Sequence, residues 1–241
     1  MDLTFDTAAT GFSPANARAC AAASRLAYSE PPDVTGRQTD TQAIVRDCGN
    51  AIVVAFRGTT NVRDFITDAE AWRRNIEDCQ IHSGFYRALV SINDELTAHI
   101  AGLPPRPLFI TGHSLGGALA ILFAFRLVLP PFPIHGVYTF GQPRVGNRNF
   151  AELYDRFQPA NTFRFVNEQD IVPRVPGALS GYQHAGQEIF LPAVGGMKLN
   201  PPLWFKLLSD AWGTAREWKH GSIAQLADHH MDKYLFKVNA L

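Results

Sequence analysis

The stretch FITGHSLGGALAIL, from Phe109 to Leu122, decides the fold of this chain. It lies where RPLFITG, a pattern typical of a buried strand, gives way to LGGALAILFAFRLVL, which is helical and apolar nearly all round. Such a helix is expected inside a protein or against a sheet. Ser114 stands at the junction, with Gly112 and Gly116 two residues to either side. A serine between a strand and a helix, flanked by small residues, indicates a strained turn that exposes a nucleophile.

The rest of the chain alternates in the same way. Helical patterns cover residues 15–28, 84–102 and 147–157. Strands are predicted at QAIVRD, AIVVAFRG, HGVYTFG, NTFRFVN and GQEIFLP, the first two joined as a hairpin by Gly49-Asn50. Strands that alternate with helices predict an α/β fold, with a mostly parallel central sheet and helices on both faces. We therefore expect residues 1–241 to form a single domain.

Composition narrows the classes of function. Hydrophobic residues make up 46% of the chain, which is enough for a sizeable core. Lys plus Arg and Asp plus Glu both number 22, and this balance argues against a nucleic-acid partner. The three cysteines have no CxxC spacing, so we expect neither a thiolate metal site nor a disulfide framework. No apolar run is long enough for a transmembrane segment.

The N-terminal stretch MDLTFDTAATGFSP has no basic region followed by an apolar one, so it does not resemble a signal peptide as it stands. A cytoplasmic protein and a secreted protein with a trimmed or unconventional leader both fit this observation. The sequence leaves the compartment open.

A nucleophilic serine needs a base held by a carboxylate, and in α/β-hydrolases the chain order is Ser, acid, His. Asp170 lies in EQDIVPRVP, directly after a predicted strand, where an open parallel sheet carries functional side chains. Glu168 is the neighbouring rival. Asp155 is less suitable because it lies within a helical stretch.

Four histidines precede Asp170, against the expected order: His82, His99, His113 and His135. Four others follow it and are candidates for the base: His184, His220, His229 and His230. The last two are adjacent in DHHMDKYL and must point in different directions, so only one of them can meet Ser114.

Six motifs together resemble the class 3 lipases, the group that includes the filamentous-fungal triacylglycerol lipases. They occur in the family's order between about residues 52 and 235: FRGTTNVRDFI, GHSLGG, TFGQPRVGN, VNEQDIVPRVP, HAGQEIFL and DHHMDKYL. The resemblance implies an α/β-hydrolase fold and an ester hydrolase that needs no metal or organic cofactor.

The resemblance also implies roles for single residues. The nucleophile falls on Ser114 and the acid on Asp170. The base falls on His229, because the family's histidine precedes a tyrosine by five residues, although His230 departs from the family pattern. Two groups are implied to bind the oxyanion of the tetrahedral intermediate: the backbone N–H of Leu115, and Thr59 through its N–H and hydroxyl.

Two further segments bear on the substrate. In the first, residues 61–80, apolar side chains recur at helical spacing: Phe65, Ala69, Trp72 and Ile76. The resemblance makes a lid helix of about residues 61–78, although permanent packing on the core is an equal alternative. In the second, residues 202–220, a helical stripe could line an acyl tunnel, touch a membrane or pack on the core: Trp204, Leu208, Ala211, Ala215 and Trp218. Residues 191–202 between them and the last strand read as a long loop.

These observations favour a serine carboxylic-ester hydrolase, most simply a lipase that cleaves acylglycerols through an acyl-enzyme on Ser114. The substrate is then an ester or lipid, met at a lipid–water interface. An esterase for soluble or aromatic esters, of the feruloyl type, and a phospholipase are alternatives. An inactive lipid-binding relative would need to lack a member of the triad, and none is missing.

Overall fold

The protein is described by a computed structural model that covers residues 3–59, 73–76, 78–127, 133–157, 161–168, 170–193, 195–206 and 229–241. Its centre is an eight-stranded sheet with the strand order β1-β2-β3-β6-β7-β9-β11-β12. The five strands β3, β6, β7, β9 and β11 run parallel to one another, and β1, β2 and β12 pair antiparallel at the two edges. The bounds of the strands are Val34–Gly36 (β1), Thr41–Asp47 (β2), Ile52–Phe56 (β3), Leu108–His113 (β6), Ile134–Phe140 (β7), Thr162–Asn167 (β9), Gln187–Leu191 (β11) and Lys198–Leu199 (β12).

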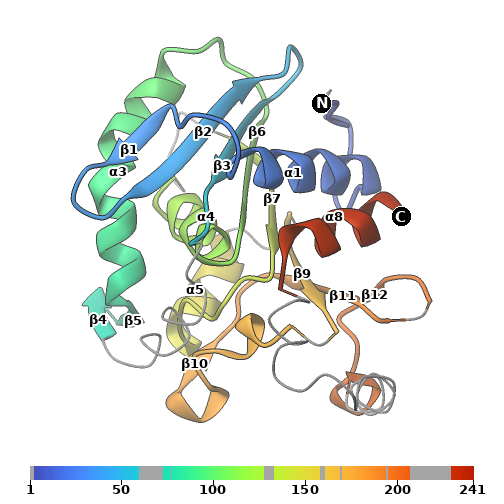
Figure 1. Cartoon of the computed structure of the whole chain (residues 1–241). Coiled ribbons are helices and arrows are strands. Elements are labelled where there is room, and N and C mark those ends of the chain that lie inside the picture. Colours follow the sequence, from blue (N-terminus) through green and yellow to red (C-terminus); the bar gives the residue numbers. More distant parts are fainter. Residues whose placement is uncertain are drawn as a thin grey trace.

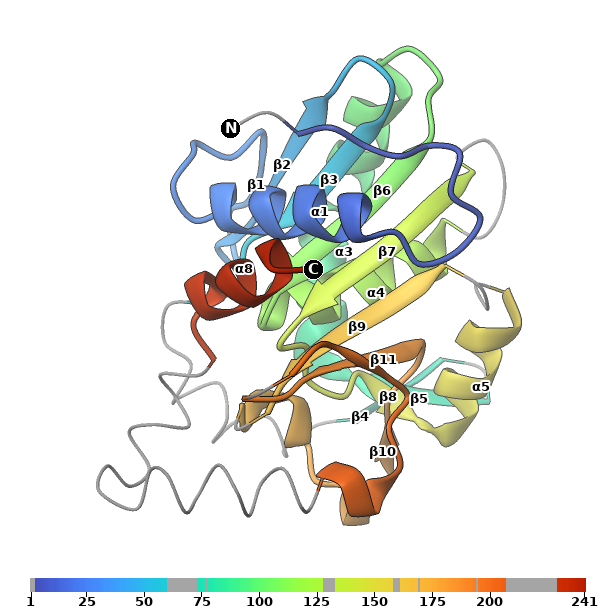
Figure 2. The same cartoon turned by 90° about the vertical axis from the view of Figure 1, so that its right-hand side faces the viewer.

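Helices cover both faces of this sheet, as Figures 1 and 2 show. On one face α1 (Pro14–Leu26) packs beside α8 (Met231–Asn239), so the two ends of the chain lie together. On the other face lie α3 (Ser83–Ala101), α4 (Leu115–Arg126) and α5 (Arg148–Phe157). The predicted fold class, a mostly parallel sheet with helices on both faces, is confirmed.

Alternation along the central strands builds two cores. In β6, Leu108 and Ile110 enter the core on the α4 side, and Phe109 between them enters the core on the α1 side. Strands with both faces buried are apolar nearly throughout, which is the pattern of RPLFITG. Helix α4 is buried nearly all round because it packs on the sheet and also against α3, as its sequence predicts.

A second, four-stranded antiparallel sheet corrects the lid prediction. Its strand order is β10-β8-β5-β4, with β4 at Arg73–Ile76, β5 at Cys79–His82, β8 at Gly146–Asn147 and β10 at Tyr182–Gln183. The predicted helix over residues 61–78 is therefore wrong at residues 73–76, which pair with β5. The helical spacing of apolar residues that ends at Ile76 gave no sign that this segment pairs with β5. The side chain of Ile76 packs against the core, as an apolar residue would in either structure. Residues 60–72 and 77 lie outside the described residues.

Two other expectations can be placed only in part. The predicted helix over residues 202–220 begins as expected, with residues 203–206 helical, and the remainder of it lies outside the described residues. The long loop predicted for residues 191–202 also contains the short edge strand β12. Within the described residues, no helix is long and apolar enough to cross a membrane. The single-domain assignment of residues 1–241 stays a prediction.

Candidate active site

Ser114 occupies a strained turn between β6 and α4. Its backbone has φ 58° and ψ −127°, a region that non-glycine residues rarely adopt. Its N–H donates to the carbonyl of Phe140 at the end of β7, 2.9 Å away, which holds the turn at the carboxyl edge of the sheet. The Oγ atom is buried and has no hydrogen-bond partner among the described residues. Strain at a buried serine whose hydroxyl is unused points to function rather than to packing.

The glycines around Ser114 are required by close backbone approaches. A Cβ atom on Gly112 would lie 2.3 Å from the backbone of Gly116, inside any real contact distance. A Cβ atom on Gly116 would lie 2.2 Å from the carbonyl oxygen of Phe56, at the end of β3. The GxSxG pattern is therefore the condition for bringing strand, turn and helix this close together.

The carboxylate that bonds His229 is that of Asp170. Its Oδ2 atom lies 2.8 Å from His229 Nδ1, and both side chains are buried. An ionised carboxylate only accepts hydrogen bonds, so the proton of a neutral His229 sits on Nδ1 and leaves Nε2 as a base. The Nε2 atom is buried without a partner among the described residues. The neighbouring His230 is exposed and is the N-cap residue of α8.

His229 also lies beside the serine turn. Its ring stacks on that of His113, the residue before Ser114, with the ring centroids 4.5 Å apart. The structure therefore brings the predicted acid and base into contact, and it places the ring of the predicted base against the residue that precedes Ser114.

Asp170 is held by two further donors. The hydroxyl of Tyr234 donates to Oδ2 at 2.6 Å, and the N–H of Val172 donates to Oδ1 at 2.8 Å. The same hydroxyl accepts from the N–H of Asn167, at the end of β9. Burial and the charge of Asp170 raise the pKa of Tyr234 well above its usual range, so the phenol stays a donor. In the sequence analysis Tyr234 only helped to locate His229, five residues before it. Its hydrogen bond to Asp170 was not predicted.

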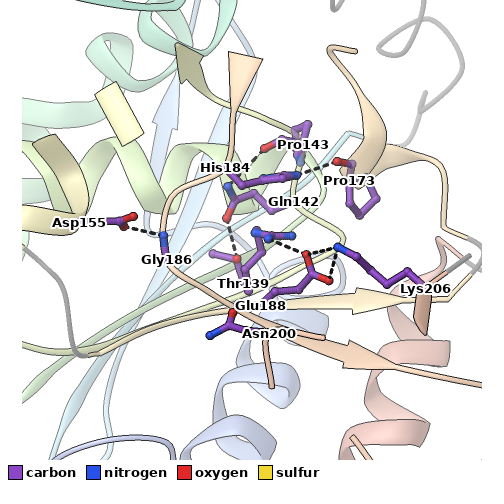
Figure 3. Close-up of polar contacts among 11 residues, drawn as sticks. Thr139, Gln142, Pro143, Asp155, Pro173, His184, Gly186, Glu188, Asn200 and Lys206 are labelled. Carbon is purple, nitrogen blue, oxygen red and sulfur yellow. Dashed lines mark hydrogen bonds and ion pairs between the residues drawn. The ribbon is translucent and has the colours of Figure 1, made fainter. Parts of the chain in front are cut away.

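Side chains from other elements anchor the loop that carries Asp170. His184 Nε2 donates to the carbonyl of Pro173 at 2.7 Å, a contact visible in Figure 3. Arg144 donates to the carbonyls of Arg174 and Pro176. Burial, followed by the charges of Arg164 and Arg144, lowers the pKa of His184 well below its usual range, so this anchor is a neutral imidazole.

An ion-paired carboxylate, that of Glu188, lies next to this loop, and Figure 3 shows it in contact with Lys206. Arg164 on β9 contacts Glu188 on β11 at 3.0 Å, and Lys206 contacts the same carboxylate. Burial raises the pKa of Glu188, but the charges and hydrogen bonds of Arg164 and Lys206 outweigh it and lower the pKa below its ordinary value. In the parallel pairing of β9 with β11, Arg164 and Glu188 lie opposite each other, so the register of the sheet brings the two side chains together.

The candidate oxyanion hole lies where β3 meets the start of α4. Leu115 is the first residue of α4, so its N–H has no acceptor within the helix. Thr59 is half-buried and follows Gly58, which packs so closely that a Cβ atom there would lie 2.6 Å from the carbonyl oxygen of His113. Both predicted residues are thus at the serine turn.

The other candidates lie elsewhere or act differently. Glu168 is buried, and its carbonyl oxygen accepts a hydrogen bond from Arg174. Asp155 is on the exposed side of α5 and accepts from the N–H of Gly186. His220 lies outside the described residues. Cys20, Cys48 and Cys79 form no disulfide with one another, and no cluster of potential metal ligands occurs among the described residues.

The sheet, the strained serine turn and the histidine–carboxylate pair at its carboxyl edge define an α/β-hydrolase fold. The sequence profile of the family "Lipase (class 3)" matches residues 53–180, more than half of the 241 residues. The chain belongs to the class 3 lipase family.

Relatives of known name agree with this assignment. The chain is 35% identical over 167 residues to "Secreted mono- and diacylglycerol lipase 1" of Fusarium solani, covering 66% of this chain and 50% of that protein. The structure of Rhizomucor miehei triacylglyceride lipase aligns with a TM-score of 0.58 at 34% identity, over 64% of this chain and 62% of that one. A fungal lipase–inhibitor complex, described as a model for interfacial activation in lipases, aligns with a TM-score of 0.58 at 31% identity, over 66% and 65%. The chain spans about half the length of the relatives that it matches by sequence.

Proposed function

We propose that this protein is a serine carboxylic-ester hydrolase that cleaves acylglycerol esters through an acyl-enzyme on Ser114. The observation that carries the proposal is the bond between His229 Nδ1 and Asp170 Oδ2, which leaves Nε2 available beside the serine turn. Membership of the class 3 lipases and the names of the relatives support acylglycerols as the substrate class.

In the proposed mechanism, Ser114 Oγ attacks the ester carbonyl carbon while His229 Nε2 takes its proton. Asp170 keeps the imidazole in the correct tautomer and stabilises the imidazolium. The oxyanion accepts hydrogen bonds from Leu115 and Thr59. The intermediate collapses as His229 returns the proton to the leaving alcohol. Water then attacks the acyl-enzyme by the same route, which releases the carboxylic acid and restores the serine.

Action at a lipid–water interface is part of this proposal. It is supported by the likeness to a lipase structure described in terms of interfacial activation. It is also supported by two exposed apolar side chains, Leu203 and Trp204, with 69% and 62% of their surface accessible. Exposed aromatic and aliphatic side chains in a helical segment suit contact with lipid.

The test compares hydrolysis of tributyrin below and above its solubility limit, with Ser114→Ala alongside. A jump in rate at the limit, absent from the variant, supports a lipase. Smooth saturation below the limit, with no jump in rate, supports an esterase that acts on dissolved esters and overturns the proposed action at a lipid–water interface. No hydrolysis, together with no labelling of Ser114 by an active-site phosphonate, would identify an inactive relative.

Single substitutions test the proposed roles on soluble p-nitrophenyl butyrate. Ser114→Ala and His229→Ala are expected to lower kcat by several orders of magnitude with folding intact. Asp170→Asn should also be severe, because the amide selects the wrong imidazole tautomer. The matched control is His230→Ala, which removes the adjacent, exposed histidine and should retain full activity. The reverse result for the two histidines would reassign the base.

A further inference from the structure

His113 is in direct contact with the proposed base, although its position before Asp170 in the chain rules it out as the base itself. It is the last residue of β6 and is 4% exposed. Besides stacking on the ring of His229, its Nε2 atom lies 2.6 Å from the backbone carbonyl oxygen of His229. Its Nδ1 atom lies 2.7 Å from the hydroxyl of Tyr28, which follows α1. Both ring nitrogens are therefore used.

The direction of these hydrogen bonds is determined by chemistry. A carbonyl oxygen only accepts, so His113 Nε2 must carry the proton and donate. Burial lowers the pKa of His113 well below its usual range, and the charge of a protonated His229 acts in the same direction. His113 is therefore a neutral imidazole with one N–H, and its Nδ1 accepts from the hydroxyl of Tyr28.

The hydroxyl of Tyr28 also reaches the candidate oxyanion hole. It packs directly against Gly58, the residue before Thr59. A Cβ atom on Gly58 would lie 2.1 Å from this oxygen, so glycine is required for the contact. Burial raises the pKa of Tyr28 above its usual range, which keeps the phenol protonated.

We propose that Tyr28 and His113 are positioning residues that fix the backbone of His229 and the backbone of the Gly58–Thr59 loop relative to each other. The inference rests on the proposed function, because it assigns both backbones to one reaction. Tyr28 donates to His113 and His113 donates to the carbonyl of His229, so one arrangement of protons satisfies these three groups. Gly58 packs against the same Tyr28 hydroxyl, which connects the two backbones. The neutral ring of His113 also tolerates the imidazolium that forms on His229, which a second cation would repel.

The first test is Tyr28→Phe, with Tyr154→Phe as the matched control. Tyr154 loses the same kind of bond, to Thr162 Oγ1 at 2.9 Å, in a buried position on α5 that takes no part in the site. One hydrogen bond corresponds to about a 3- to 10-fold effect, so Tyr28→Phe should lower kcat on p-nitrophenyl butyrate by about that factor and leave KM unchanged. Tyr154→Phe should leave kcat unchanged. Equal kcat values for Tyr28→Phe and wild type would overturn the proposal.

The second test separates a hydrogen-bonding role of His113 from mere packing. His113→Gln keeps an amide N–H that can reach the carbonyl of His229, whereas His113→Leu keeps only volume. We expect His113→Gln to retain a kcat at least about 3-fold above that of His113→Leu, which is one hydrogen bond's worth. Equal losses in the two variants, with equal melting temperatures, would show that His113 only fills space.

The third test does not depend on turnover. Nitrogen-15 NMR spectra of histidine-labelled wild type should show His113 as a neutral imidazole with its proton on Nε2, and Tyr28→Phe should shift both of its ring nitrogen signals. A proton on Nδ1, or signals unchanged in Tyr28→Phe, would refute the hydrogen-bond chain. A wild type that hydrolyses no ester but shows the Nε2 tautomer would refute the proposed function while leaving the positioning of the two backbones supported.

Discussion

The sharpest single perturbation of the site is Gly141→Ala. Gly141 follows β7 with φ +58°, and its N–H donates to the carbonyl of Phe165. A Cβ atom on Gly141 would lie 2.8 Å from Asp170 Oδ2 and 2.9 Å from His229 Nδ1, closer than real Cβ atoms approach their neighbours. These are the two atoms whose mutual hydrogen bond defines the acid–base pair. The methyl group of an alanine at this position would therefore push apart the side chains of Asp170 and His229 or displace both.

Two costs determine the expected loss of stability. A non-glycine residue in the left-handed region costs about 1–2 kcal/mol, and overpacking a buried position costs about 1–3 kcal/mol. The free energy of unfolding should therefore fall by about 2–5 kcal/mol, which leaves a domain of ordinary stability folded. Displacing catalytic groups by about 1 Å can lower activity about 100-fold, so we expect kcat to fall by about that factor.

The assay combines urea denaturation at neutral pH with kcat on p-nitrophenyl butyrate. Gly195→Ala is the control for the backbone term, because Gly195 has φ +95° and a Cβ atom added there would have no neighbour within 4 Å. Gly177→Ala controls for the substitution itself, since Gly177 has neither the positive φ nor a neighbour. Folded Gly141→Ala with wild-type kcat, or a Gly195→Ala variant that loses as much activity, would refute the steric argument.

Two further predictions concern Tyr234, which bonds Asp170, and the ion pair of Glu188 next to the Asp170 loop. Tyr234→Phe removes the donor to Asp170 Oδ2 and leaves the N–H of Asn167 without its acceptor. The free energy of unfolding, measured by urea denaturation, should therefore fall by about 2–4 kcal/mol. An unchanged denaturation midpoint would contradict this prediction. Glu188 has a pKa that is lower in the folded protein than in the unfolded chain, so its contribution to stability is present above the unfolded pKa and is lost as the pH falls through the folded one. The advantage of wild type over Glu188→Gln in unfolding free energy should therefore shrink from about pH 5 downwards, around the usual Glu value of about 4.3, whereas a pH-independent difference would contradict the ion-pair explanation.

Local patterns in the sequence were sufficient for the central sheet, the helices that cover it and the strained turn at Ser114. Strands buried on both faces must be apolar throughout, and a helix that packs on the sheet and under another helix must be apolar nearly all round. RPLFITG and LGGALAILFAFRLVL carry both patterns on either side of Ser114. The spacing of Gly112 and Gly116 likewise encodes a close approach within a few residues of the chain, which local sequence expresses directly.

Contacts between distant parts of the chain were decided by tertiary structure alone. The pairing of β4 with β5 replaced a helix at residues 73–76, because a backbone partner outweighs the helical spacing of a few side chains. The residue pattern without the family resemblance leaves His229 and His230 open, whereas the fold buries His229 against Asp170 and exposes His230 at the N-terminus of α8.

The residues that surround the candidate site show most clearly what only the tertiary structure decides. Tyr28, His113, Gly141 and Tyr234 come from four separate segments, and no spacing in the sequence relates one to another. They meet because parallel strands end at one edge of the sheet and because the two ends of the chain pack on the same face. Sequence motifs predict the groups that react, whereas hydrogen bonds made across the folded chain determine how the side chains of these residues are held.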